Sequence, residues 1–320
     1  MDALSDVLRV ARLSGGVFMR ADFTAPWCIA AQLSPDKCAP FLKRTAHIIP
    51  FHYVIEGEFF ARVEGGEPVL LRSGELVLFP GNDVHVMGTD LGLPPAKAAD
   101  IVLPSDGSGL RSIRHGGGGA PTKLICGYLG SETVQGNPII AAMPGLIHLK
   151  IEEFGPAEWI RTSFEYAAGE VSAGRIGSDT VLSRLSELLF VEAVRRYVDN
   201  VPAGQTGWLA GLQDASVARA LALMHGDIAR EWSVDELARE TGLSRSVLAE
   251  KFTRLVGMAP IHYLMHWRMQ VAAQKLKETS ASLAQIAESV GYESDAAFSR
   301  AFKKTFGRAP AGWRRDGSLG

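Results

Sequence analysis

The sequence lacks the features that would place the chain in a membrane or an oxidising compartment. No apolar run approaches the ~20 residues that a membrane-spanning helix needs. The N-terminal segment MDALSDVLRVARLSGG has neither a continuous apolar stretch nor a signal-peptide cleavage site. The three cysteines, Cys28, Cys38 and Cys126, match no metal-binding spacing, and an odd number favours a reducing cytoplasm over a disulfide framework. We therefore expect a cytoplasmic protein with no membrane partner.

The chain also lacks a strong net charge, because the formal charges of its 320 residues add up to −2. These charges are unevenly distributed. Residues 215–320 contain 15 Lys and Arg against 11 Asp and Glu, whereas the rest of the chain contains 18 against 24. The basic surplus of the C-terminal part is weak evidence for a polyanionic partner, because similar surpluses occur on solvated helices.

The N-terminal half is rich in short β-type segments. HIIPFHYVIEG, EFFARVEG, EPVLLRSG and ELVLFPG lie within residues 17–87 and are separated by Gly and Pro turns. Such segments predict an all-β sandwich or barrel. Residues 91–121, rich in Gly, Pro and Ser, predict a long surface loop before a last strand at 122–130.

Helical spacing begins near residue 138. IRTSFEYAAGE (160–170) and SDTVLSRLSELLFVEAVRRYV (178–198) predict helices, and the second contains a wide apolar stripe. Both core packing and self-association in a homodimer explain this stripe. Segment 201–211 is the expected linker. The expected regions are a β-rich N-terminal domain at 1–135, a helical region at 136–205 and a helical C-terminal domain at 212–316.

One phrase occurs twice in the C-terminal part. GLSRSVLAEKFTRLVGMAP (242–260) and GYESDAAFSRAFKKTFGRAP (291–310) each predict a Ser-capped helix that ends at Gly. A shorter helix precedes each copy, which is the helix-turn-helix pattern. The second turn contains one extra residue. Between the copies, APIHYLMHWRMQVAAQKLKET predicts one helix whose length of roughly 27 Å suits recognition helices in successive major grooves, ~34 Å apart.

The C-terminal hundred residues closely resemble AraC/XylS-type transcriptional regulators. The resemblance rests on DELARETGLSRSVLAEKFTRLVG, WRMQVAAQKL and IAESVGYESDAAFSRAFKKTFGRAPAGWR. It implies binding to double-stranded promoter DNA and, for an activator, contact with RNA polymerase. The expected DNA-contacting residues are Arg245, Ser246, Ala249, Glu250, Arg254, Arg268, Ala296, Ser299, Arg300, Lys303 and Lys304. In the first copy, Glu250 either accepts a hydrogen bond from cytosine or pairs with Arg254 and contacts no base.

Residues 50–87 resemble the cupin-type sensory domain of one branch of this regulator family. Gly74, Pro80, Gly81 and His85 fit the second cupin motif, and His52, Glu56 and Gly57 fit part of the first. Pro50 stands two residues before His52, where a metal-binding cupin normally has a second histidine, so no metal or other cofactor is expected. We expect instead a pocket for a small-molecule effector. Its candidate residues are His52, Glu56, His85 and Cys126.

These observations predict an α+β protein with an N-terminal cupin-like β-barrel or sandwich, central helices and a C-terminal all-α domain with two helix-turn-helix motifs. The predicted function is a DNA-binding transcription regulator, not an enzyme, that senses a small molecule and forms a homodimer. One alternative is a thiol-based redox regulator that acts through Cys126 or the Cys28/Cys38 pair. Another is a metal-dependent cupin enzyme fused to a DNA-binding module.

Overall fold

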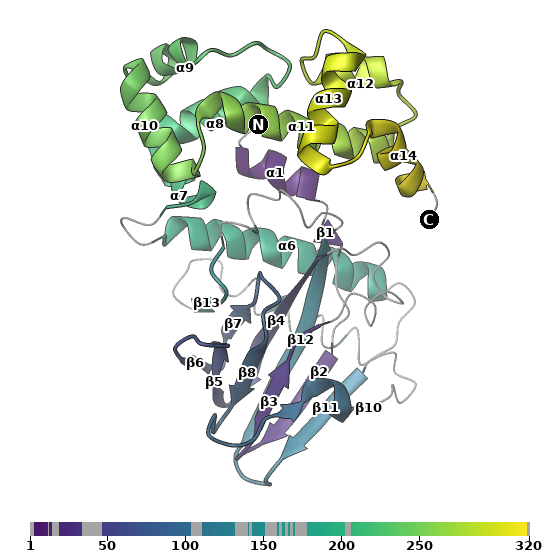
Figure 1. Cartoon of the computed structure of the whole chain (residues 1–320). Coiled ribbons are helices and arrows are strands. Elements are labelled where there is room, and N and C mark those ends of the chain that lie inside the picture. Colours follow the sequence, from purple (N-terminus) through teal and green to yellow (C-terminus); the bar gives the residue numbers. More distant parts are fainter. Residues whose placement is uncertain are drawn as a thin grey trace. The chain divides into compact units, whose positions relative to one another are not determined.

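The computed structural model (Figure 1) describes residues 3–11, 13–14, 19–33, 47–103, 111–131, 140, 143–150, 159, 162–163, 166, 169, 178–201 and 206–318. Contacts group the chain into two compact units. The β-rich unit comprises Arg12–Gln135 and Met143–Tyr197, and the helical unit comprises Met1–Ala11, Gly136–Ala142 and Val198–Gly320. Most of the helix predicted at 160–170 lies outside the described residues. No described helix is both long and apolar enough to cross a membrane.

Two sheets build the β-rich unit. The larger sheet has the order β10-β11-β2-β12-β4-β7-β13, with β1 also paired to β12, and the smaller sheet has the order β6-β5-β8-β3-β9. The strands of the larger sheet are β1 Leu13–Ser14, β2 Met19–Thr24, β4 His47–Glu56, β7 Glu75–Leu78, β10 Val102–Leu103, β11 Arg111–Gly116, β12 Pro121–Ser131 and β13 Ile147–Lys150. Those of the smaller sheet are β3 Cys28–Ala31, β5 Glu58–Val63, β6 Val69–Arg72, β8 His85–Gly88 and β9 Ala96–Lys97.

The core of this unit combines apolar side chains from both sheets. Ala21 and Phe23 alternate with more exposed neighbours along β2, as expected for a strand with one buried face. They belong to one buried cluster with Val54 of β4, Phe59 of β5 and Met87 of β8. The predicted sandwich or barrel is therefore a two-sheet arrangement with a shared core.

The predicted loop at 91–121 was wrong in part, because it contains regular structure. Strand β11 lies within it and pairs in parallel with β2, and the short helix α3 (Ala98–Ile101) follows β9. Sequence spacing concealed β11 because only Ile113 of this strand is fully buried. Its regularity comes from backbone hydrogen bonds to a strand about 90 residues earlier.

Helix α6 (Ser178–Asp199) lies where the second long helix was predicted. Its apolar stripe is divided between two environments. Leu189, Phe190 and Val194 are buried, whereas Leu188 is 54% exposed and Val181 is 39% exposed. Core packing accounts for the first group but not for the second.

The helical unit contains a succession of helices (Figure 1). They are α1 Ala3–Ala11, α7 Trp208–Gln213, α8 Ala215–Gly226, α9 Val234–Thr241, α10 Arg245–Val256, α11 Pro260–Glu278, α12 Leu283–Ser289, α13 Asp295–Phe306 and α14 Pro310–Ser318. Helix α7 begins inside the segment predicted as a linker, and its Trp208 and Leu209 are buried. Part of the expected linker is thus core of the helical unit.

Local signals set the ends of the repeated helices as predicted. Ser244 and Ser294 cap α10 and α13 by accepting hydrogen bonds from Val247 N and Ala297 N. Gly257 and Gly307 end these helices in the left-handed region, with φ of 85° and 73°. The two predicted helix-turn-helix motifs, α9–α10 and α12–α13, are confirmed, and α11 joins them.

The N-terminal helix α1 packs within the helical unit and not within the β-rich unit, contrary to the expected 1–135 region. Its Ala3 and Val7 are buried, and it contacts α8 and α11. Asp6 Oδ2 lies 3.6 Å from Nδ1 of His225 on α8, and His225 Nε2 lies 2.8 Å from Tyr263 Oη on α11. The spacing of Ala3 and Val7 is a helical signal, but nothing in it identifies the surface they cover.

Candidate nucleic-acid interface and buried histidine cluster

The outer face of α13 is basic and available. Phe298 and Phe302 are fully buried, which fixes the helix orientation, and Arg300, Lys303 and Lys304 are exposed on its other side. Among the described residues, no carboxylate forms an ion pair with these three cations. Ala296 is exposed and Ser299 is half-buried on the same helix, so small groups border the cations. This combination suits phosphate contacts together with base contacts.

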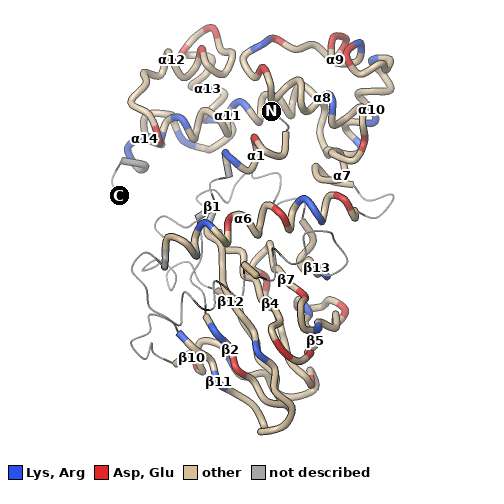
Figure 2. Tube along the Cα trace, turned by 180° about the vertical axis from the view of Figure 1, so that it is seen from behind, with Lys and Arg blue, Asp and Glu red and all other residues tan. Residues whose placement is uncertain are grey.

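Helix α10 has both basic and acidic residues along its length (Figure 2). Its outer face is more mixed in charge than that of α13, because Arg245, Glu250 and Arg254 are all exposed. Leu248 and Phe252 are its buried anchors. Arg245 is exposed but lies 3.3 Å from Asp235 of α9, and Ser246 Oγ lies 3.2 Å from the capping Ser244 Oγ. Part of the α10 face is therefore already engaged within the protein.

Glu250 and Arg254 are both exposed on α10, and Ala249, which precedes Glu250, is half-buried. The two charged groups form no ion pair with each other in the described structure. The pairing that would have withdrawn Glu250 from DNA is thus not observed. Its carboxylate remains free to accept a hydrogen bond from a base.

Arg268 differs from the other expected DNA-contacting residues because it is buried. It is 9% exposed, on the inner side of α11, and donates hydrogen bonds to backbone carbonyl oxygens of residues 228–230 and 291. Its guanidinium is therefore not available to DNA in this structure. Helical periodicity alone left its face ambiguous, because Trp267 and Arg268 are adjacent.

His52 and His85 come together inside the β-rich unit, with ring centroids 5.7 Å apart. The His85 ring stacks on Phe79 at 3.8 Å, and its Nδ1 lies 3.0 Å from the carbonyl oxygen of Asp83. Both ring nitrogens of His52 and Nε2 of His85 are buried without a hydrogen-bond partner in the described structure. Burial lowers the pKa of His85 to about 4, and burial beside His85 lowers the pKa of His52 well below its ordinary value. Both imidazoles are consequently neutral at pH 7.

Cys126 belongs to this cluster and Glu56 does not. Cys126 pairs with His52 across the β12–β4 ladder, so the two side chains lie on the same face. Glu56 is four residues along β4 from His52, roughly 13 Å at the rise of an extended strand, and its carboxylate pairs with Lys123 Nζ. The expected convergence of Glu56 with the histidines was wrong, because Lys123 holds it near the end of the strand.

Cys28 and Cys126 lack the environment of reactive thiols. Cys126 is buried, and this burial raises its pKa to about 12. Burial, and secondarily the Asp90 carboxylate, raises the pKa of Cys28. A reactive thiol requires a lowered pKa and exposure, so Cys28 and Cys126 do not fit the redox alternative. Cys38 lies outside the described residues.

Within the described part of the chain, no group of three or more His, Cys, Asp and Glu side chains is placed to hold a metal ion. Sequence reasoning also missed a polar network within residues 227–236. It likewise missed the hydrogen bonds from Arg268 to the carbonyl oxygens of residues 228–230 and of Gly291.

Comparison with known proteins connects both units to regulators. A cupin family model matches residues 2–199, and a helix-turn-helix domain model matches residues 237–316. A protein of Streptomyces lividans named as an AraC-like transcription regulator is 31% identical over 100% of both chains, and a similarly named protein of Streptomyces antibioticus is 29% identical over 98% of this chain and 99% of its own. The HTH-type transcriptional regulator AlkR of Acinetobacter baylyi is 30% identical over 99% of this chain and 100% of its own.

The matched cupin region contains the sheets and the histidine cluster, and the matched helix-turn-helix region contains α10, α11 and α13. The relatives of Streptomyces lividans and Acinetobacter baylyi align with both of these regions, because their matches extend along almost the whole chain. The protein therefore belongs to the AraC-like family of transcription regulators, with a cupin domain at its N-terminal end and a helix-turn-helix DNA-binding domain at its C-terminal end.

Proposed function

We propose that this regulator binds promoter DNA with α10 and α13 in adjacent major grooves, and that α13 supplies most of the electrostatic anchoring. The observation that carries this proposal is the exposed row Arg300, Lys303 and Lys304, which has no ion-pair partner among the described residues. On α10, Arg245 forms an ion pair with Asp235, so this helix offers fewer unpaired cations than α13 does. Ser246, Ala249, Glu250, Arg254, Ala296 and Ser299 complete the proposed contact surface.

Selection of duplexes from a random-sequence library with the full chain, followed by hydroxyl-radical footprinting, tests this proposal. The expected footprint has two protected half-sites about one helical turn apart on one DNA face. A footprint over a single half-site, or no enrichment of any sequence, would contradict it. Genome-wide mapping of bound sites would then identify the regulated genes and show whether RNA polymerase is recruited there.

We further propose that an uncharged small molecule controls DNA binding by reaching the imidazoles of His52 and His85. Its support is the pair of neutral, buried rings with unpartnered nitrogens within an otherwise apolar cluster. An ionic ligand is disfavoured there, because its charge would be desolvated without compensation. A hydroxyl or carbonyl group on an apolar body matches the available hydrogen-bonding atoms.

A thermal-shift screen with alcohols, aldehydes and phenols tests the effector proposal. An effector should raise the unfolding temperature of the wild type and change its affinity for DNA. The same compound should have neither effect on His52→Ala. Without effector, this variant should bind DNA with near-normal affinity. His148→Ala is the matched control, because His148 Nε2 is already 2.9 Å from Glu75 Oε2. Equal loss of response in both variants would argue against a specific role for His52.

We also propose that the exposed side of α6 pairs with a second copy. In an antiparallel pair with a two-fold axis at Leu188, the exposed Leu188 side chains of the two copies would pack against each other. Arg184 would lie opposite Glu192 of the other copy, but within one chain these two groups already pair with Glu187 and Arg196, so the apolar contact carries this proposal. Leu188→Glu should then convert a dimer to a monomer in light scattering after size exclusion. An unchanged mass would refute pairing through this face.

A further inference from the structure

Arg268 lies at the middle of α11 and connects two segments that are far apart in the sequence. Its Nε donates to Ile228 O at 2.8 Å, and its Nη2 donates to Ala229 O at 3.2 Å and Arg230 O at 2.8 Å. Its Nη1 donates to Gly291 O at 3.2 Å. Three of these carbonyls precede the first helix-turn-helix, and the fourth belongs to the turn of the second. One buried side chain therefore ties both motifs to the helix between them.

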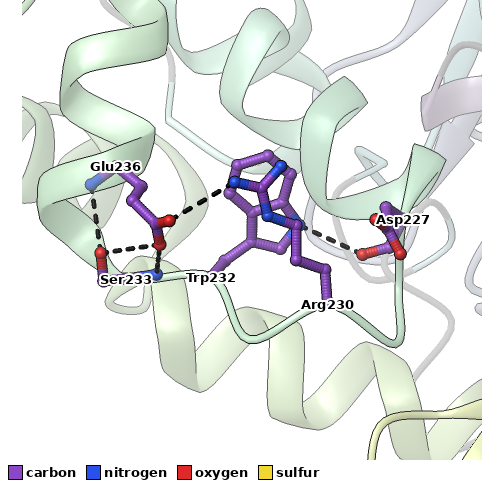
Figure 3. A network of polar contacts seen from close by, with 5 residues as sticks. All are labelled: Asp227, Arg230, Trp232, Ser233 and Glu236. Carbon is purple, nitrogen blue, oxygen red and sulfur yellow. Dashed lines mark hydrogen bonds and ion pairs between the residues drawn. The ribbon is translucent and has the colours of Figure 1, made fainter.

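The first of these segments is held in place before α9 begins (Figure 3). Trp232 Nε1 donates to Asp227 O at 3.1 Å, and the Arg230 guanidinium lies 3.9 Å from the centre of the Trp232 ring. Ser233 and Glu236 form a reciprocal capping box, and Glu236 also lies 3.4 Å from Arg230 Nη2. The loop thus presents its carbonyl oxygens to Arg268 from a conformation fixed by its own contacts and by the start of α9.

The second segment approaches the same place closely, and only glycine permits this approach. Gly291 has a φ of 76°, and a Cβ there would lie 2.4 Å from Ala229 O and 2.7 Å from Arg268 Nη2. Gly242, at the corresponding place in the first motif, has a φ of 70° but no heavy atom within 4 Å of such a Cβ. The two glycines share a backbone conformation, and only Gly291 also serves a contact between motifs.

We propose that Arg268, residues 228–230 and Gly291 form a clamp that sets the separation and orientation of α10 and α13, and hence the base-pair spacing at which the protein binds two half-sites. Helix α11 fixes the distance between its own ends, but each motif could still rotate about the non-helical segments that flank α11, at residues 257–259 and 279–282. The clamp restricts this rotation because it joins the loop before α9 directly to the turn before α13. Arg268 is a positioning residue in this proposal and contacts no base.

The test uses the full-length protein and the duplex selected by the wild type from a random library. Affinity is measured by fluorescence anisotropy for four probes: the intact duplex, the two duplexes with one half-site scrambled, and a duplex with one base pair inserted between half-sites. One base pair changes the axial separation by about 3.4 Å and also rotates one site relative to the other. For the wild type we expect this insertion to weaken binding at least tenfold.

Arg268→Lys keeps the charge but cannot bridge four carbonyls, and Gly291→Ala places a methyl group against Ala229 O. Both should weaken binding to the intact duplex tenfold or more, leave each scrambled duplex within about twofold, and reduce the penalty of the insertion. Gly242→Ala is the matched control, because it introduces the same left-handed strain without the collision. It should keep the wild-type ratio between intact and inserted duplexes.

Several outcomes would overturn the clamp. If Arg268→Lys weakened binding equally to the intact and scrambled duplexes, Arg268 would only stabilise the fold. Loss of folded protein in both Arg268→Lys and Gly291→Ala would lead to the same conclusion. An unchanged insertion penalty in these two variants would refute control of spacing. The clamp rests on the proposed binding of DNA by both motifs. A wild-type footprint over only one half-site would therefore overturn both proposals. A wild-type footprint over two half-sites, together with an unaltered spacing preference in the Arg268 and Gly291 variants, would overturn the clamp alone.

Discussion

Replacement of Lys303 by alanine should remove one phosphate contact and leave the fold intact. The side chain is exposed in the last turn of α13 and has no ion-pair partner among the described residues. Neutralisation of one phosphate contributes about 0.9 to the slope of log affinity against log salt. Between 50 and 200 mM salt, one contact therefore accounts for a roughly 3.5-fold change in affinity, and the Lys303→Ala, Lys304→Ala double variant for roughly 12-fold.

Fluorescence anisotropy over that salt range measures these slopes directly. Arg219→Ala is the charge-matched control, since Arg219 is exposed on α8, outside both recognition helices. The control should keep the wild-type slope, and the unfolding temperature of each variant should change little, because a single charge at a helix end contributes only about 0.3–1 kcal/mol. Equal slopes for Lys303→Ala and the wild type would show that Lys303 contacts no phosphate.

Three further predictions concern base contacts and pH. Arg300→Ala should weaken binding to the selected duplex and relax discrimination at one base pair by roughly 1–3 kcal/mol; an unchanged preference in a repeated selection would exclude Arg300 from base contact. Glu250→Gln should relax discrimination at one cytosine if the free carboxylate accepts from its N4 group, and an identical selected sequence would exclude this contact. Burial lowers the pKa of His85 to about 4. Between pH 6.5 and 4, the His85 imidazole is therefore protonated in the unfolded state but not in the folded state. Because protons then favour the unfolded state, the free energy of unfolding should fall as the pH is lowered. The slope should approach about 1.4 kcal/mol per pH unit for each buried histidine, and His85→Gln, measured by urea unfolding at pH 7.5 and 5.5, should show a smaller decrease than the wild type.

The contrast between the two motifs indicates a division of labour within the DNA-binding domain. Both recognition helices keep the same buried anchors and the same Ser and Gly boundaries. Their outer faces differ, because α13 has three free cations and α10 has a paired Arg245 and an unpaired Glu250. We expect α13 to dominate salt-dependent affinity and α10 to contribute more to discrimination than to attraction.

The sequence by itself determined the features that depend on near neighbours along the chain. A Ser cap requires a backbone N–H three residues later, and a terminal Gly requires only its own left-handed φ, so both recognition helices were predictable to their ends. Helical periodicity likewise assigned Phe298 and Phe302 to the core. Repetition of this local pattern identified the DNA-binding domain.

Only the tertiary structure decided which polar residues are available. Arg268 was expected at the DNA surface, but carbonyl oxygens from residues 23 to 40 positions away hold it inside the domain. Glu56 was expected beside His52, but Lys123 on the neighbouring strand holds it elsewhere. Gly291 and Gly242 are alike in backbone conformation and differ only in what approaches them. In each case the deciding partner is distant in the sequence, and no local pattern specifies which distant group will occupy that space.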